Sequence, residues 1–391
     1  MDRLITPSKA DLFLRQAAYL LQSETCRYDI ALGRTLRENI SADRPFPPFD
    51  RVTMDGICCR VAELGLAPLT LKGTQAAGES PSKNLTHGAC REILTGAVMP
   101  ADCDTVIPVE DIEIEGVLVH LKSGARAVAG KFIHRIGSDA EKGAVMVLEG
   151  SRLTAAHLGL AASVGATELS VTRRPRVLVL STGDELVAPD ESPDSHQIRQ
   201  SNGPTLCAAI QNWGAVEVAW RHVGDDFQHL KRELAQALRE NDLLVIAGGI
   251  SMGKKDFVRP VLEQLVGPPR FHGVKQQPGK PLAVWTSKPF VFALPGNPLS
   301  ALNTLHRYVI PTLCRLSGCP PPSAWNLPFV EARERLPEFT RFFPARVTPE
   351  GRVQTYMARN SGDLTALGEA AGFAEIAAGT GMAEEGVYRA W

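Results

Sequence analysis

The sequence predicts an α/β protein in which a doubly wound sheet is combined with separate β regions. Three short apolar runs are each followed by a glycine-rich turn, and these runs are Val177–Leu180, Leu243–Ile246 and Phe290–Ala293. Runs this short and this rich in Val, Ile and Leu are typical of parallel strands buried on both faces. Helical periods alternate with them, most clearly over 227–238. Alternation of strands and helices favours a doubly wound sheet.

The first half of the chain predicts a helix, a junction and an inserted β region. Pro7 suits the first turn of a helix over 7–22, in which Leu12, Ala17 and Leu21 recur on one side. Because Pro45, Pro47 and Pro48 prevent a helix or a central strand, they mark a domain junction. Short apolar runs broken by Gly and Pro then predict an all-β region, and a helix follows over 155–164.

The second half predicts the sheet and a final β region. Ser201 caps a helix that ends at Trp213 before Gly214. Other helices are expected over 227–238, 256–265 and 298–316, and strands over 216–219 and 282–284. The 391 residues exceed one ordinary core. The predicted domains are a mixed N-terminal domain (1–46 with 144–174), an inserted β domain (47–143), the α/β domain (175–322) and a small C-terminal β domain (323–391).

The charge and cysteine content exclude several classes of partner. Lys and Arg number 42 against 43 Asp and Glu, and this balance argues against duplex nucleic acid as a partner. No apolar run reaches the roughly 18 residues of a membrane span, and the N-terminus lacks the layout of a secretory signal. None of the eight cysteines has C-x2-C spacing, so reduced thiols in a cytoplasmic protein are expected.

The glycine-rich turns predict a ligand site at one edge of the sheet. Open α/β sheets bind ligands where strands end at their carboxyl side, and glycine allows backbone N–H groups to approach an anion. Asp184, Glu185 and Asp256 lie in or beside these turns, and carboxylates suit a site that also holds a cation. The pattern indicates a phosphate-bearing small molecule.

Three motifs have competing interpretations. The segment 248–254 matches the glycines and lysine of a P-loop, but Lys255 stands where magnesium needs a hydroxyl. A general backbone nest to which Ser251 adds a hydroxyl fits better. Asp225 suits either ligand contact or the start of the next helix, where a carboxylate complements the dipole. Lys280 lies in a proline-bounded loop and suits either an oxyanion contact or a solvated position.

Six motifs in order make the chain resemble the molybdopterin molybdenumtransferases, the MoeA family, to which the C-terminal domain of gephyrin also belongs. They are Pro47–Gly56, Leu94–Ala97, Ser181–Leu186, Gly248–Gly253, Pro278–Pro281 and Leu294–Pro298. The matches extend from about residue 12 to 318, and the C-terminal part is similar only in length and pattern.

The resemblance implies an elongated homodimer with a molybdopterin-binding α/β domain. It would insert molybdenum from molybdate into adenylylated molybdopterin and release AMP. The implied catalytic residues are Asp55, Thr95, Glu185 and Asp256, with Asp55 and Thr95 supplied to the partner's site. The implied substrate-binding residues are Asp139, Thr182, Gly183, Asp184, Asp225, Gly248, Gly249, Ser251, Lys280, Pro295, Gly296 and Asn297.

A cation follows from the charges of the expected site. Anionic substrates and acidic side chains repel each other unless a divalent ion lies between them, so Mg²⁺ is expected at Glu185, Asp225 and Asp256.

Four positions depart from the family pattern. The family often has a basic residue where Gln277 stands and Tyr where Ile57 stands, and Arg and Glu are expected in place of His134 and Ser138. These changes bear on anion affinity, and with it on activity and on a preference for molybdate or tungstate, more than on the fold. Two other functions remain open: a non-catalytic molybdopterin carrier or scaffold, and the adenylyltransferase of the preceding step. The latter is usually a single small domain, so the β regions argue against it.

Overall fold

The computed structural model describes residues 4–82, 85–250 and 256–391. The chain divides into two compact units. The first comprises Met1–Glu38, Glu149–Leu158 and Glu168–Trp391, and the second comprises Asn39–Leu148 and Gly159–Thr167. Each unit is described by itself below.

A six-stranded sheet forms the centre of the first unit, in the order β16-β13-β17-β21-β20-β18. Its strands are β13 (Arg176–Thr182), β16 (Glu217–Val223), β17 (Leu243–Ala247), β18 (Phe271–His272), β20 (Ala283–Trp285) and β21 (Phe290–Leu294). The first three strands of this order and β21 are parallel, which confirms the prediction from the apolar runs. The strands β20 and β18 add an antiparallel edge.

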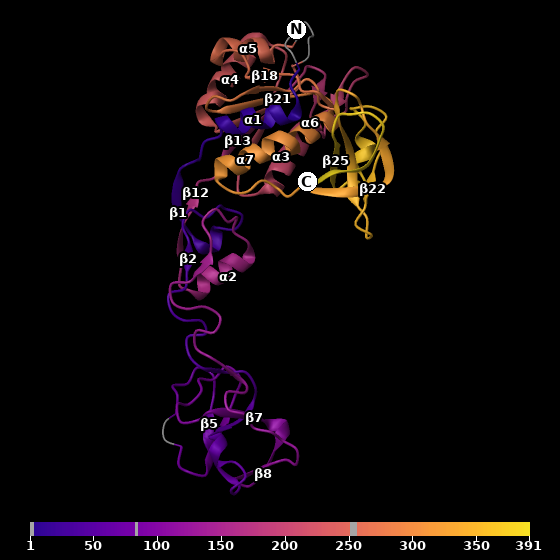
Figure 1. The fold of residues 1–391 in the computed structure, drawn as a ribbon. Helices are drawn as coiled ribbons and strands as arrows, with labels where there is room; N and C mark the ends of the chain where they lie inside the picture. The colour runs from indigo at the N-terminus through magenta and orange to yellow at the C-terminus, as the bar shows by residue number, and fades with distance from the viewer. Residues whose placement is uncertain (1–3, 83–84, 251–255) are drawn as a thin grey trace. The chain divides into compact units, whose positions relative to one another are not determined.

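Helices cover both faces of this sheet, so the predicted doubly wound architecture is confirmed (Figure 1). The helices are α1 (Pro7–Ala17), α3 (Asn202–Trp213), α4 (Phe227–Glu240), α5 (Val258–Val266), α6 (Pro298–Thr304) and α7 (Ile310–Ser317). Side chains alternate across each strand: Val177 and Val179 pack with α1, α3 and α7, whereas Leu178 and Leu180 pack with α4 and α5. Both faces of the sheet are therefore buried.

The helix boundaries correct the sequence predictions at four places. Helix α1 ends at Ala17 instead of residue 22, because Ala18 turns extended and leads to β1 (Ser23–Arg27). Its buried residues are Pro7, Ala10 and Leu14, and Leu12 is exposed. Helix α3 ends at Gly214 as expected, but the side chain of Ser201 makes no capping bond. Helix α5 begins at Val258, two residues after the predicted start. The predicted helix 298–316 contains a π-helical segment, Leu305–Val309.

A closed barrel forms the C-terminal part of the first unit. Its strands are β22 (Trp325–Glu334), β23 (Thr340–Val347), β24 (Val353–Thr355), β25 (Gly372–Ile376) and β26 (Met382–Ala390). Pairing of β23 with β25 closes it around a core that includes Phe329 and Tyr388. The short strand β19 (Gln276–Gln277) joins β23 in parallel, which connects the α/β layer to the barrel. Two further pairs are β1 with β12 (Glu168–Thr172), and β14 (Leu186–Val187) with β15 (Ile198–Arg199).

The second unit is built mainly from strands, as predicted. Its main sheet has the order β7-β4-β6-β5-β9-β8. These strands are β4 (Gly56–Cys59), β5 (Leu69–Gln75), β6 (Ala89–Ile93), β7 (Thr105–Pro108), β8 (Ile112–Glu115) and β9 (Leu118–Leu121). Two small pairs complete it, β2 (Ile40–Ser41) with β11 (Val145–Val147) and β3 (Arg51–Val52) with β10 (Ile133–His134). The predicted helix near 155–164 is α2 (Ala155–Ser163).

The cysteines agree with the expectation of reduced thiols. All eight cysteines are free, and six of them are buried. Burial raises the pKa of Cys59 to about 12, so this thiol is protonated at neutral pH. Among the described helices, none combines the length and the apolar character needed to cross a membrane.

Candidate active site

The turns after β13, β17 and β21 line one cavity of about 630 Å³, here called the acidic cavity. It lies where the parallel strands end, as the glycine turns predicted. Ten residues predicted from the sequence line it: Thr182, Gly183, Glu185, Asp225, Gly248, Gly249, Asp256, Pro295, Gly296 and Asn297. Of the remaining predicted residues, Ser251 falls outside the described residues.

The turn after β17 needs glycine for steric reasons. Gly248 and Gly249 have φ values of 103° and 64°, in the left-handed region. A Cβ atom on Gly249 would lie 2.7 Å from Cγ2 of Val258, which is closer than packed atoms approach. The backbone of this turn can therefore face the cavity without a side chain between it and a ligand.

Two buried oxygens in the acidic cavity have no hydrogen-bond partner within the described residues. They are Oγ1 of Thr182 and Oε1 of Gln200. An unpaired buried polar atom costs roughly 1–3 kcal/mol, so a ligand that supplies partners would recover this energy. Sequence reasoning did not select Gln200, since no motif marks the end of β15.

Asp184 supports the turn instead of lining the cavity. Its Oδ1 accepts a hydrogen bond of 2.9 Å from the backbone N–H of Asp225, which ties the turn after β13 to the turn after β16. A second link, from Nδ2 of Asn202 to the carbonyl oxygen of Gly296 (2.6 Å), ties α3 to the turn after β21. The cavity wall is therefore braced by side chains from neighbouring turns.

The carboxylates of the acidic cavity come from three different turns. Glu185, Asp225 and Asp256 all line it, and Arg199 is the guanidinium in the same described lining. Within residues 4–82, 85–250 and 256–391, no three His, Cys, Asp or Glu side chains form a cluster suited to a metal ion. Magnesium commonly takes one or two carboxylates and completes its shell with phosphate and water oxygens. This donor set fits that mode of binding, and a preassembled three-carboxylate cage is not formed.

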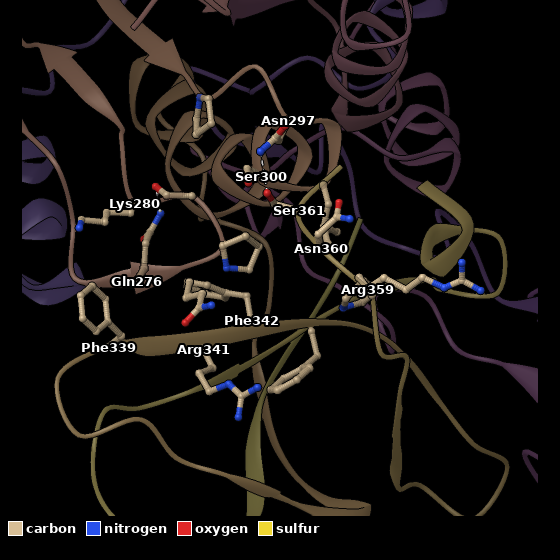
Figure 2. A pocket seen from close by; sticks show the side chains of 18 of the residues that line it. Gln276, Lys280, Asn297, Ser300, Phe339, Arg341, Phe342, Arg359, Asn360 and Ser361 are labelled. Carbon is tan, nitrogen blue, oxygen red and sulfur yellow. Dashed lines mark hydrogen bonds between the residues drawn. The ribbon is translucent and has the colours of Figure 1, made fainter. Parts of the chain in front are cut away.

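A second cavity of about 630 Å³ adjoins the first and is here called the basic cavity (Figure 2). The two share Pro281, Pro295 and Asn297. Three cations line the basic cavity, Lys280 from the loop after β19, Arg341 from β23 and Arg359 from the loop after β24. Its described lining contains no carboxylate.

Polar and aromatic groups complete the basic cavity. Ser300, Asn360 and Ser361 offer hydroxyl and amide groups, and Phe339 and Phe342 form an apolar wall (Figure 2). The ammonium of Lys280 lies 5.9 Å from the ring centre of Phe339. Lys280 and Arg359 are exposed and Arg341 is partly buried, so water partly screens their attraction for an anion.

The sequence predicted only part of the basic cavity. Lys280 was selected, whereas Arg341, Arg359 and Ser361 were missed because the barrel carries no recognisable motif. Gln277, which departs from the family pattern, is exposed and lines this cavity.

The remaining predicted residues lie in the second unit. The backbone N–H of Thr95 donates a hydrogen bond of 2.6 Å to Oδ1 of Asp55, so the structure brings this pair together. That bond lowers the pKa of Asp55 below its usual value, and the carboxylate is charged at neutral pH. The next position, Gly56, must be glycine because a Cβ atom there would lie 1.9 Å from the carbonyl oxygen of Ile107.

Asp139 and two positions that depart from the family pattern, His134 and Ile57, differ in their surroundings. Oδ1 of Asp139 lies 2.8 Å from Nε2 of His134, so two positions expected near the site pair with each other. Ile57 is buried in the sheet, with 1 % of its surface exposed. The departure at residue 57 therefore concerns core packing.

The fold and the cavities define a multidomain α/β protein with a composite site for anionic ligands, and the comparisons with known proteins specify the family. The model for the "MoeA N-terminal region (domain I and II)" matches residues 6–165, and that for the "Probable molybdopterin binding domain" matches residues 178–315. A molybdopterin molybdenumtransferase from a Synechocystis species is 35% identical over 361 residues, covering 90% of each chain. The chain belongs to the molybdopterin molybdenumtransferase (MoeA) family, a family of transferases, which confirms the resemblance.

Other relatives agree with this membership. Gephyrin from Dictyostelium discoideum is 30% identical, over 78% of this chain and 48% of gephyrin. A crystal structure of a MoeA protein of molybdopterin biosynthesis from Pyrococcus horikoshii is 30% identical, with a TM-score of 0.79 and 99% of both chains covered. Another from that organism has a TM-score of 0.83 at 23% identity, covers both chains completely and supports the fold.

Proposed function

We propose that this chain transfers molybdenum from molybdate to adenylylated molybdopterin and releases AMP, with magnesium as the required cation. The observation that carries the proposal is the pair of adjoining cavities of opposite charge. Two anionic substrates repel each other, so an enzyme that joins them needs separate stabilisation for each. Separate chambers that meet at Pro295 and Asn297 suit this requirement.

The acidic cavity is proposed to hold the pterin nucleotide. Backbone N–H groups at Gly248 and Gly249 suit phosphate oxygens. The unpaired oxygens of Thr182 and Gln200 suit N–H and amino donors, which a pterin and an adenine both carry.

One or two of the carboxylates of Glu185, Asp225 and Asp256 would bind the magnesium ion, and phosphate and water oxygens would complete its shell. When bound, magnesium neutralises phosphate charge and polarises the phosphoanhydride for cleavage by water. The same carboxylates also disfavour free molybdate in this chamber through charge repulsion.

The basic cavity is proposed to hold the oxyanion. Lys280, Arg341 and Arg359 provide N–H donors, and a guanidinium can donate two parallel hydrogen bonds to one tetrahedral anion. An anion bound where the two cavities adjoin would lie beside the nucleotide and away from bulk water.

We further propose a cytoplasmic homodimer in which Asp55 and Thr95 serve the partner's site, and in which Asp139 contributes to substrate binding. The family resemblance at the segment Pro47–Gly56 supports this role. The Thr95 hydrogen bond keeps Asp55 ionised and oriented, which suits a charged group that contacts a cation or a proton donor.

One assay tests the activity directly. Purified protein is incubated with adenylylated molybdopterin, magnesium and molybdate, and AMP and active cofactor are quantified. Release of both products that depends on molybdate is expected, and a Glu185→Gln variant should retain the fold but lose most of the product. Binding of the nucleotide without AMP release would instead favour the carrier or scaffold function.

A further inference from the structure

A buried amide connects the core of the α/β layer to the loop that carries Lys280. Gln276 is completely buried, and its Nε2 donates a hydrogen bond of 2.9 Å to the carbonyl oxygen of Gly279. Its Oε1 accepts a hydrogen bond of 2.5 Å from the hydroxyl of Tyr308, which is also completely buried. The side chain of Gln276 therefore holds Gly279, the residue directly before Lys280, from inside the protein.

The same strand positions a second cation of the basic cavity. In the pairing of β19 with β23, Gln276 lies opposite Thr340 and Gln277 lies opposite Arg341. Gln276 thus contacts the loop of Lys280 through its side chain and lies on the strand that pairs with the strand of Arg341. Figure 2 shows Gln276 beneath Lys280 and near the barrel strand.

The helical segment that carries Tyr308 is joined by ion pairs to two other parts of the fold. Tyr308 belongs to the π-helical segment Leu305–Val309, a distortion that often occurs at functional positions. The neighbouring Arg307 pairs with Asp11 of α1 at 2.8 Å and with Glu375 of the barrel at 2.9 Å. The hydroxyl of Tyr308 is therefore a fixed anchor.

We propose that Tyr308 and Gln276 are positioning residues that set the distance between Lys280 and Arg341, and thereby the affinity of the basic cavity for its oxyanion. The inference rests on the proposed function of that cavity. Neither residue needs to touch the anion: the effect passes through the carbonyl oxygen of Gly279 and through the β19–β23 pairing. A buried hydrogen-bond chain suits this task because its geometry tolerates little displacement.

Tyr308→Phe removes one oxygen and leaves the ring in place. Oε1 of Gln276 then loses its buried partner, so its amide turns or shifts and releases Gly279. The half-saturating molybdate concentration is expected to rise about tenfold, within the range that an unpaired buried acceptor produces. The affinity for the pterin nucleotide and the maximal rate should change less than about twofold.

Tyr388→Phe is the matched control. Tyr388 is also buried, its hydroxyl donates a hydrogen bond of 3.0 Å to the carbonyl oxygen of Ala371, and it lines neither cavity. It should lose similar thermal stability and keep the wild-type requirement for molybdate.

A double variant separates positioning from stability. Combining Tyr308→Phe with Gln276→Leu removes both polar partners, so the free energy of unfolding should partly recover. The support of Gly279 stays absent, and the molybdate requirement should stay high. A return to the wild-type requirement in the double variant would overturn the inference, as would an unchanged requirement in Tyr308→Phe.

Molybdate binding measured by titration calorimetry distinguishes this inference from the proposed function. If the wild type binds molybdate without turnover, the transferase function fails, whereas weaker binding in Tyr308→Phe still supports the positioning role. If the wild type shows no molybdate binding, either by calorimetry or in its kinetics, both the proposed function and the positioning role are overturned.

Discussion

Nδ2 of Asn297 donates a hydrogen bond of 2.6 Å to Oγ of Ser361. Asn297 follows β21 and lines both cavities, whereas Ser361 belongs to the barrel and lines the basic cavity (Figure 2). This single bond therefore joins the wall that the two chambers share to the loop after β24.

Removing either partner of that bond should have different effects on the two substrates. Asn297→Ala should raise the half-saturating concentrations of both nucleotide and molybdate, since Asn297 lines both cavities. Ser361→Ala should raise only that of molybdate, by roughly fivefold for a hydrogen bond worth about 1 kcal/mol. Steady-state kinetics with each substrate varied in turn measures this, and equal effects of the two variants on both substrates would contradict it.

The proposed sharing of the site between subunits predicts complementation. Asp55→Ala and Glu185→Ala homodimers should each be inactive. Mixed dimers contain one site of two that has lost neither residue, and random assortment makes half of the dimers mixed, so activity should recover to about a quarter of the wild-type value. Confirmed mixed dimers with no recovered AMP release would argue against a shared site.

The carboxylates of the acidic cavity predict a strict need for a divalent ion. EDTA should abolish AMP release and weaken nucleotide binding less, because the backbone of Gly248 and Gly249 still contacts phosphate. Asp256→Asn should raise the half-saturating magnesium concentration about tenfold or more. Arg199→Gln, on the same cavity wall, is the control and should leave the magnesium requirement unchanged. Full turnover in metal-free buffer would refute the assignment.

A positive charge at residue 277 should improve the capture of the oxyanion. Gln277 is exposed, so the added charge is partly screened and is worth about 1 kcal/mol or less. Gln277→Lys should therefore lower the half-saturating molybdate concentration roughly two- to fivefold and leave the maximal rate nearly unchanged. The gain should shrink at high salt. An unchanged requirement at low salt, with the fold intact, would place residue 277 outside the anion's reach.

Acid stability should depend on Asp242, far from both cavities. Burial alone would raise its pKa, but the Arg173 guanidinium at 2.6 Å and the backbone N–H of Arg176 at 2.8 Å hold the pKa below its ordinary value of 3.8. A carboxyl with a lowered pKa stabilises the folded state above its unfolded pKa, and this contribution disappears as pH falls through the folded value.

Asp242→Asn tests that contribution. It should cost about 2 kcal/mol of unfolding free energy at pH 7, because Arg173 loses its partner in a half-buried position. The difference from the wild type should shrink as pH falls below the ordinary pKa of 3.8, where the carboxyl protonates first in the unfolded chain, and vanish below the lowered folded pKa. Thermal melts from pH 7 to pH 3 measure this, and a constant difference across that range would contradict the pKa argument.

The doubly wound sheet and the acidic cavity could be predicted from short segments of the chain. Buried strands produce continuous apolar runs, and backbone turns near an anion require glycine, so Val177–Leu180 and Gly248–Gly249 report their environment locally. Ten of the predicted residues consequently meet in one cavity. The predicted end of α1 was wrong, because the local apolar period does not reveal where the chain leaves the helix for β1.

The basic cavity and its internal support depend on contacts between distant parts of the chain. Arg341, Arg359 and Ser361 line the same cavity as Lys280 because β19 pairs with β23 across the interval between residues 277 and 340, and the closed barrel then places its loops beside Asn297. Gln276 and Tyr308 are 32 residues apart and meet only in the packed core. Such contacts depend on long-range strand pairing and on helix packing, whose partners no short segment of sequence specifies.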